Sequence, residues 1–308
     1  MATTYNFIAQ NKRKSWLLII GFLIFAGLLG YLFGYLNDAG YFGTIVAFVI
    51  AIPSALISYF ASDKIALAVN GAVEVNPQGS AEERQVYRLV ENLAITAGIP
   101  TPRVYVIPDT ALNAFATGRD PEHASIAITT GLLNRLEKTE VEGVIAHELS
   151  HVKNYDIRLS TLVVVLVGFI ALLSDFFLRF SFLGGRRRSS DRDAGQLGGI
   201  LAIIGIVLMI LAPIFARLIS LAVSRQREFL ADASGVLLTR YPEGLARALE
   251  KIEHDPNVLQ RANNATMHLY LSNPYEGEEK KSRGGLARLF STHPPIEERI
   301  HRLREMNL

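Results

Sequence analysis

Two histidines flank a glutamate in the stretch His147-Glu148-Leu149-Ser150-His151, which lies in a segment with helical periodicity. Residues four apart lie on one face of a helix, so His147 and His151 can direct their imidazoles at one metal ion. Glu148 lies about 100° further round the helix, where its carboxylate can reach a water on that metal. Imidazoles at this spacing suit zinc, and a carboxylate beside the water suits hydrolysis. The pattern therefore predicts a zinc hydrolase.

The alternative is a pair of solvent-facing histidines beside an ordinary helical glutamate. The flanking residues argue against it, because they are apolar and would bury the helix: Val144, Ile145, Ala146 and Leu149. The sequence has no cysteine, so a zinc ion must be held by histidine and carboxylate groups, and no disulfide stabilises the fold.

The composition is that of a membrane protein with a polar domain. Of the 308 residues, 50% are hydrophobic and 19% are charged, and the mean hydropathy is +0.25. That is apolar for a soluble protein and too charged for a chain buried wholly in lipid. The net charge of +2 gives no reason to expect nucleic-acid binding.

Two apolar runs at residues 16–36 and 41–60 predict a transmembrane hairpin, since about 20 residues span a bilayer core. Lys12-Arg13-Lys14 precedes the first run and Lys64 follows the second, which places both ends of the hairpin in the cytoplasm. The alternative is a buried hairpin in a soluble protein.

Two further apolar runs, at about 159–173 and 197–216, are also long enough to cross a membrane. The basic loop between them fits the outer face poorly, so crossing is favoured by length but not settled. Two crossings and none both return the chain to the same side.

The remaining stretches indicate a globular domain divided by the second pair of runs. Ser80 and Glu83 resemble a capping box that opens an amphipathic helix, and Thr139 to Glu142 resemble a second one that opens the histidine helix. Strands are expected at 103–107, 112–118 and 124–130, and later helices at 218–238, 244–254, 257–271 and 296–305. The resulting divisions are a cytoplasmic N-terminus at 1–15, the hairpin at 16–60, a catalytic segment at 61–156, an apolar pair at 157–223 and a second catalytic segment at 224–308.

Four stretches in a fixed order carry a family resemblance: Asn113 to Gly118, His147 to His151, Arg227 to Asp232, and Thr292 to Pro295. With the four apolar runs they cover nearly the whole chain, which resembles the HtpX-like membrane zinc metalloproteases, relatives of the Ste24 CAAX prenyl proteases. The resemblance implies a mostly α membrane protein with two to four transmembrane helices. Its helical zincin-type domain would contain a small β-sheet.

The resemblance also implies an activity and a place in the cell. It implies a zinc endopeptidase of the cell membrane, with one zinc ion per chain and with the catalytic domain and both termini in the cytoplasm. The expected partners are the lipid bilayer and polypeptide substrates, and the expected role is the removal of misfolded or damaged membrane and cytoplasmic proteins.

The third zinc ligand is assigned to Glu228. Closer placements fail, because a ligand six residues beyond His151 would fall on Ile157 and one further along would fall near Ala171, inside an apolar run. An antiparallel pairing of the third and fourth runs would bring Glu228 level with the two histidines. The alternative is that Glu228 only pairs with a neighbouring arginine.

Three weaker assignments complete the expected site. Asp232, one turn after Glu228, is expected to accept the free ring N–H of a zinc-bound histidine, unless it pairs with Arg225 or Arg227. The stretch Asn113, Ala114, Phe115 and Ala116 is expected to form an edge strand that binds the substrate backbone, although an internal strand is the alternative. His293 is a candidate donor to the oxyanion, and a surface histidine is the alternative.

Two rival functions differ in class. A prenyl-protein peptidase would need a lipid-sized chamber, which four apolar runs look too few to enclose. A membrane scaffold would have a structural zinc site, and such sites usually fill all four positions and favour cysteine. An isolated set of two histidines and one glutamate favours catalysis.

Overall fold

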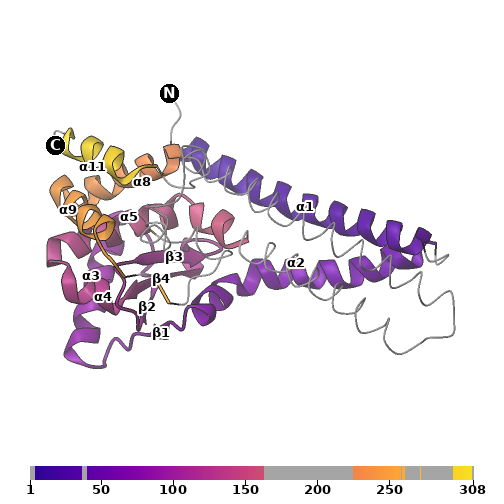
Figure 1. Cartoon of the computed structure of the whole chain (residues 1–308), viewed down its shortest axis with the longest axis horizontal. Coiled ribbons are helices and arrows are strands. Elements are labelled where there is room, and N and C mark those ends of the chain that lie inside the picture. Colours follow the sequence, from indigo (N-terminus) through magenta and orange to yellow (C-terminus); the bar gives the residue numbers. More distant parts are fainter. Residues whose placement is uncertain are drawn as a thin grey trace.

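The computed structural model describes residues 4–36, 40–162, 225–257, 259–260, 271 and 294–306. Two long helices, α1 (Thr4–Leu36) and α2 (Phe42–Val69), form a hairpin that projects from a globular part (Figure 1). Within them, Ile8–Tyr31 and Phe42–Ala61 are long and apolar enough to cross a membrane. Large apolar side chains such as Leu17, Ile24 and Leu28 are exposed along α1, as lipid contact would require. The second predicted pair of apolar runs lies almost entirely outside the described residues.

The two hairpin helices approach closely at a glycine. A Cβ atom added to Gly30 would lie 2.4 Å from Cβ of Ala47 and 2.6 Å from the carbonyl oxygen of Gly43. Small residues of this kind let apolar helices pack by backbone contact. Helix α1 also begins well before the predicted span, and its amino-terminal part lies against the globular part near α8 (Figure 1).

The sheet has four strands in the order β1-β2-β4-β3. They are β1 (Val73–Glu74), β2 (Arg103–Ile107), β3 (Ala114–Gly118) and β4 (Ala124–Thr129). Strands β2 and β4 are parallel, and the other two pairs are antiparallel. The three predicted strands are confirmed, and β3 lies at one edge. A single 3-10 turn, η1 (Pro121–His123), joins β3 to β4.

The helices of the globular part pack on this sheet or on one another (Figure 1). They are α3 (Ala81–Ala97), α4 (Thr130–Arg135), α5 (Lys138–Lys153), α8 (Arg225–Thr239), α9 (Pro242–Glu253) and α11 (Ile296–Arg304). The capping box of Ser80 and Glu83 is confirmed at the start of α3. Together with the two candidate membrane helices, this is a mostly helical protein with a small mixed sheet, as predicted.

The predicted capping box at Thr139 is wrong. Helix α5 begins at Lys138, and the carboxylate of Glu140 accepts a hydrogen bond of 2.7 Å from the backbone N–H of Glu137. Glu140 is also held by Lys251 of α9, whose Nζ lies 2.7 Å from its Oε2. A contact from a distant helix thus fixes the side chain that caps α5, which local sequence does not show.

Helix α5 is the central element, with α8 and α9 packed on it through glycines. A Cβ atom added to Gly235 of α8 would lie 2.9 Å from the backbone nitrogen of His147. A Cβ atom added to Gly143 of α5 would lie 2.7 Å from the backbone nitrogen of Leu245 on α9. Because protein interiors are close-packed, these contacts fix how near the helices lie and so position the side chains between them.

Candidate metal centre

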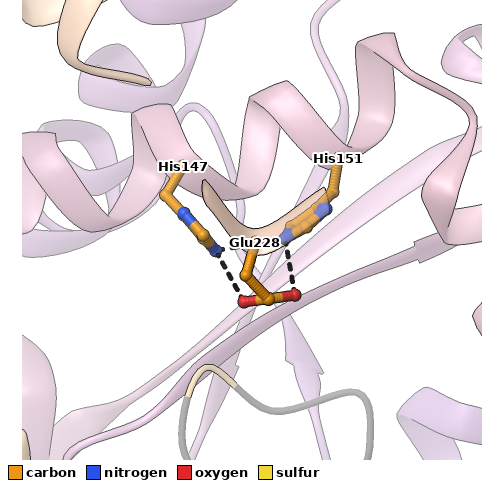
Figure 2. Close-up of side chains that lie close together, drawn as sticks. All are labelled: His147, His151 and Glu228. Carbon is orange, nitrogen blue, oxygen red and sulfur yellow. Dashed lines mark hydrogen bonds and ion pairs between the residues drawn. The ribbon is translucent and has the colours of Figure 1, made fainter. Parts of the chain in front are cut away.

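Three side chains converge between α5 and α8. His147 and His151 point from α5 toward Glu228 of α8 (Figure 2). The Nε2 atoms of the two histidines are 3.1 Å apart. Nε2 of His147 lies 3.7 Å from Oε2 of Glu228, and Nε2 of His151 lies 3.6 Å from its Oε1. One ligand atom from each residue lies within 4.8 Å of the other two.

This arrangement fits zinc. Two imidazole nitrogens and a carboxylate form the set that catalytic zinc sites use, with a fourth position left open. Tetrahedral bonds of roughly 2.0–2.1 Å place two donor atoms roughly 3.3 Å apart. The three observed separations, 3.1, 3.6 and 3.7 Å, lie around that value. His147 and Glu228 are buried and His151 is nearly so, which pre-organises the donors.

An aspartate lies against the other ring nitrogen of each histidine. Oδ1 of Asp232 is 2.8 Å from Nδ1 of His147, and Oδ2 of Asp156 is 3.0 Å from Nδ1 of His151. A histidine that binds a metal through Nε2 carries its proton on Nδ1, and a carboxylate there fixes the ring orientation. Asp232 therefore makes the contact that the sequence analysis expected, whereas the sequence analysis assigned Asp156 no role at the site.

Arg299 of α11 is a site residue that the sequence analysis missed. Its side chain is fully buried and donates two hydrogen bonds to Asp232. Nε lies 2.9 Å from Oδ2, and a terminal nitrogen lies 2.6 Å from Oδ1. Its other terminal nitrogen lies 3.6 Å from Oε2 of Glu228. A signal was present, because Arg299 lies on the same helical face as the buried Ile296, Ile300 and Leu303.

The alternative prediction was that Glu228 and Asp232 only pair with the neighbouring Arg225 or Arg227. The contacts of Arg227 and Asp232 differ from it. Arg227 is buried and directs a terminal nitrogen at Oδ1 of Asp156, 3.4 Å away. Asp232 pairs instead with Arg299. The two acidic side chains of α8 thus face α5 and α11.

Glu148 lies on the sheet side of α5. It is buried, and its carboxylate lies near the backbone of Ala116 in β3. Burial raises the pKa of Glu148 to about 8; nearby His151 acts to lower it, and the Glu228 carboxylate adds to the rise. The carboxyl group of Glu148 thus lies near the three candidate ligands but is not one of them.

The remaining pKa shifts reflect how many charges are buried together. Burial lowers the pKa of His151, but Asp156 and Glu228 outweigh it and raise that pKa to about 9. For His147, burial outweighs Asp232 and the pKa lies below its usual value. Burial raises the pKa of Asp232, but Arg299 and His147 more than offset this and keep that pKa low.

The outer edge of β3 faces this site. Residues 114, 116 and 118 direct backbone groups away from β4. The backbone N–H of Leu271 donates to the carbonyl of Ala114 at 3.2 Å, and the N–H of Gly118 donates to Oγ1 of Thr161 at 3.3 Å. Asn113 precedes the strand, and its side chain accepts from the N–H of Ala114 at 3.0 Å. His293 lies outside the described residues.

Comparisons of the sequence with known proteins show its family. The sequence model of peptidase family M48 matches residues 80–307. A protein named protease HtpX homolog from Streptococcus gordonii is 44% identical over 301 residues, which cover 97% of this chain and 98% of that protein. A protein of the same name from Dictyoglomus thermophilum is 45% identical over 304 residues, which cover 99% of this chain and 95% of that protein. The solved structure of S. mikatae Ste24p is 22% identical with a TM-score of 0.48, and the match covers 90% of this chain and 62% of that one.

Proposed function

The chain belongs to peptidase family M48 and is a zinc metalloprotease of the HtpX type, and from this premise we propose that it cleaves misfolded or damaged membrane and cytoplasmic proteins as a membrane-embedded endopeptidase. The observation that carries the proposal is the convergence of His147, His151 and Glu228 beside the carboxylate of Glu148. These three residues would hold the zinc ion.

Glu148 is the general base in this proposal. When bound, zinc supplies Lewis-acid chemistry that makes a water acidic near neutral pH. Glu148 takes the proton of the attacking water and then delivers it to the leaving amine. Its place one residue after His147, on the side of α5 that faces β3, puts its carboxylate between the ligands and the expected path of the substrate.

Strand β3 is proposed to bind the substrate. An extended peptide can add to the edge of a sheet through main-chain hydrogen bonds, with little reading of side chains. The outward-facing backbone of Ala116 in β3 lies near the carboxylate of Glu148, which supports this role for the stretch Asn113 to Ala116. Recognition of backbone suits a protease that acts on unfolded segments. His293 is proposed as the donor to the oxyanion.

We propose the same division of the chain that the sequence predicts. The catalytic domain would lie on the cytoplasmic side of the cell membrane and would consist of residues 61–156 and 224–308. The hairpin would anchor it in the membrane. The packing of α8 against α5, and of α11 against α8, supports this, because residues from both segments meet at the site. The pair at 157–223 would join the two segments as apolar helices.

The proposal is tested with the full chain purified in detergent and supplied with zinc. Cleavage of casein, or self-cleavage, is compared between the parent and Glu148→Gln. The variant keeps the shape of the side chain but cannot accept a proton, so we expect cleavage to be lost while zinc stays bound. A variant that cleaves as fast as the parent would show that the catalytic assignment is wrong.

A further inference from the structure

We propose that the apolar helix α1 holds the metal ligand His151 in place, acting through Asn11 and Asp156. The proposal rests on the proposed function, because it takes His151 to bind zinc. In this proposal α1 supports the metal site as well as anchoring the chain in the membrane. The length and composition of α1 alone would indicate only the anchor. Asn11 is the positioning residue.

A short path of hydrogen bonds joins α1 to the site. Asn11 is fully buried. Its side-chain N–H group donates to Oδ1 of Asp156 at 2.7 Å, and the other oxygen of Asp156 lies 3.0 Å from Nδ1 of His151. Asp156 can hold the imidazole in one orientation only if its own carboxylate is held, and the amide of Asn11 does this at close range.

The same end of α1 fixes the turn that presents Asp156. After α5 ends at Lys153, Tyr155 adopts a left-handed backbone conformation with φ of +61°. A bulky residue persists in that conformation only where its surroundings hold it. Asn11 donates to the carbonyl of Asn154 at 2.9 Å, and Nζ of Lys12 lies 4.2 Å from the centre of the Tyr155 ring. Both of these side-chain contacts to the turn come from α1.

A second hydrogen-bond partner of Asp156, on α8, is a weaker restraint. Arg227 of α8 approaches the same Oδ1 atom at 3.4 Å, which is long for a hydrogen bond between charged groups. Arg227 supplies a charge near Asp156, while Asn11 supplies the short, directed contact. Loss of Asn11 would therefore free the carboxylate to turn toward Arg227 and away from His151.

The aspartates that contact the two histidines are themselves held by different parts of the molecule. Asp232, which contacts His147, is gripped by Arg299 of α11, within the globular part. Asp156, which contacts His151, is gripped by α1. Displacement of α1 would thus loosen one ligand and leave the other in place. Zinc affinity should then depend on the position of the amino-terminal part of α1 against the turn that carries Asp156. The metal site would thus be coupled to the hairpin.

The test measures zinc affinity rather than cleavage. Full-length protein in detergent micelles is loaded with zinc and titrated with a chromogenic chelator. Asn11→Leu removes the donor at similar volume, and we expect zinc to bind about 10-fold more weakly, the lower end of the range for direct partners of ligating histidines, because Asn11 acts through Asp156. Ser15→Ala is the matched control, since Ser15 is buried on the same helix and donates within it, to the carbonyl of Asn11 at 2.9 Å. We expect its affinity to stay within about twofold of the parent.

A double variant separates positioning from general damage to the fold. If Asn11 acts through Asp156, adding Asn11→Leu to Asp156→Ala should weaken zinc binding no further, because the path is already cut. Should Asn11→Leu fail to fold, Asn11→Ser serves, since its hydroxyl is too short to reach Asp156. Parent-like affinity in the Asn11 variant, or a double variant weaker than Asp156→Ala alone, would overturn the proposal. A parent that binds no zinc would instead overturn the proposed function.

Discussion

Replacement of Arg299 by methionine should destabilise the zinc-free protein strongly. Arg299 is fully buried and makes two short contacts to Asp232, at 2.9 and 2.6 Å, while Glu228 lies 3.6 Å away. Removing one partner of a buried ion pair costs about 3–5 kcal/mol, because the other charge stays buried without compensation. At about 2–4 °C per kcal/mol, the melting temperature should fall by about 6–20 °C.

The assay is thermal unfolding in detergent, with a chelator present and again with excess zinc. Bound zinc brings positive charge to Glu228, so the deficit of Arg299→Met should be smaller in the zinc-loaded protein. Arg302→Met is the matched control, because Arg302 is exposed on the same helix, pairs with Glu298 at 2.8 Å and lies over the Phe229 ring, 3.7 Å from its centre. An exposed ion pair and an exposed cation–π contact each contribute about 0–1 kcal/mol, so this variant should melt much closer to the parent than Arg299→Met does.

A second substitution identifies the cause of the loss. Adding Asp232→Asn to Arg299→Met removes the uncompensated charge, so the double variant should regain much of the lost stability. The reasoning would be refuted if Arg299→Met melted within about 2 °C of the parent. It would also be refuted if the two substitutions destabilised additively, since they would then act independently.

Two further predictions address the packing of α8 and the topology of the hairpin. Gly235→Ala should weaken zinc binding and lower the melting temperature, because its Cβ would lie 2.9 Å from the backbone nitrogen of His147 and push α8 off α5; Gly21→Ala, with no atom within 4 Å of the added Cβ, is the control in the same assays. Cysteine labelling should find residue 37 accessible from outside the cell and residue 80 accessible only from inside, and equal access from outside would contradict the proposed hairpin topology.

Local patterns predicted the parts of the site that depend on spacing along one element. The histidine helix, the three strands and the capping box at Ser80 follow from periodicity and from short-range side-chain chemistry, and the structure has each of them. Glu228 was placed by supposing that two distant segments run antiparallel, and α8 does bring it to the histidines.

The supporting contacts could not be predicted in the same way. Asn11 and Asp156 are 145 positions apart, and Arg299 and Asp232 are 67 apart. Which buried polar residues meet depends on the register of packed helices, and that register is set by close contacts such as Gly235 against His147. The same reason explains the error at Thr139, where Lys251 of α9 helps to fix the capping side chain.

Zinc content of purified variants tests the metal site most directly. The parent and Glu228→Ala are expressed and purified side by side, and bound metal is counted by mass spectrometry against protein concentration. If Glu228 completes the site with His147 and His151, the parent carries one zinc ion per chain and Glu228→Ala loses it almost completely. One zinc ion per chain in Glu228→Ala would contradict the account and would leave Asp232 or Asp156 as the acid to consider next.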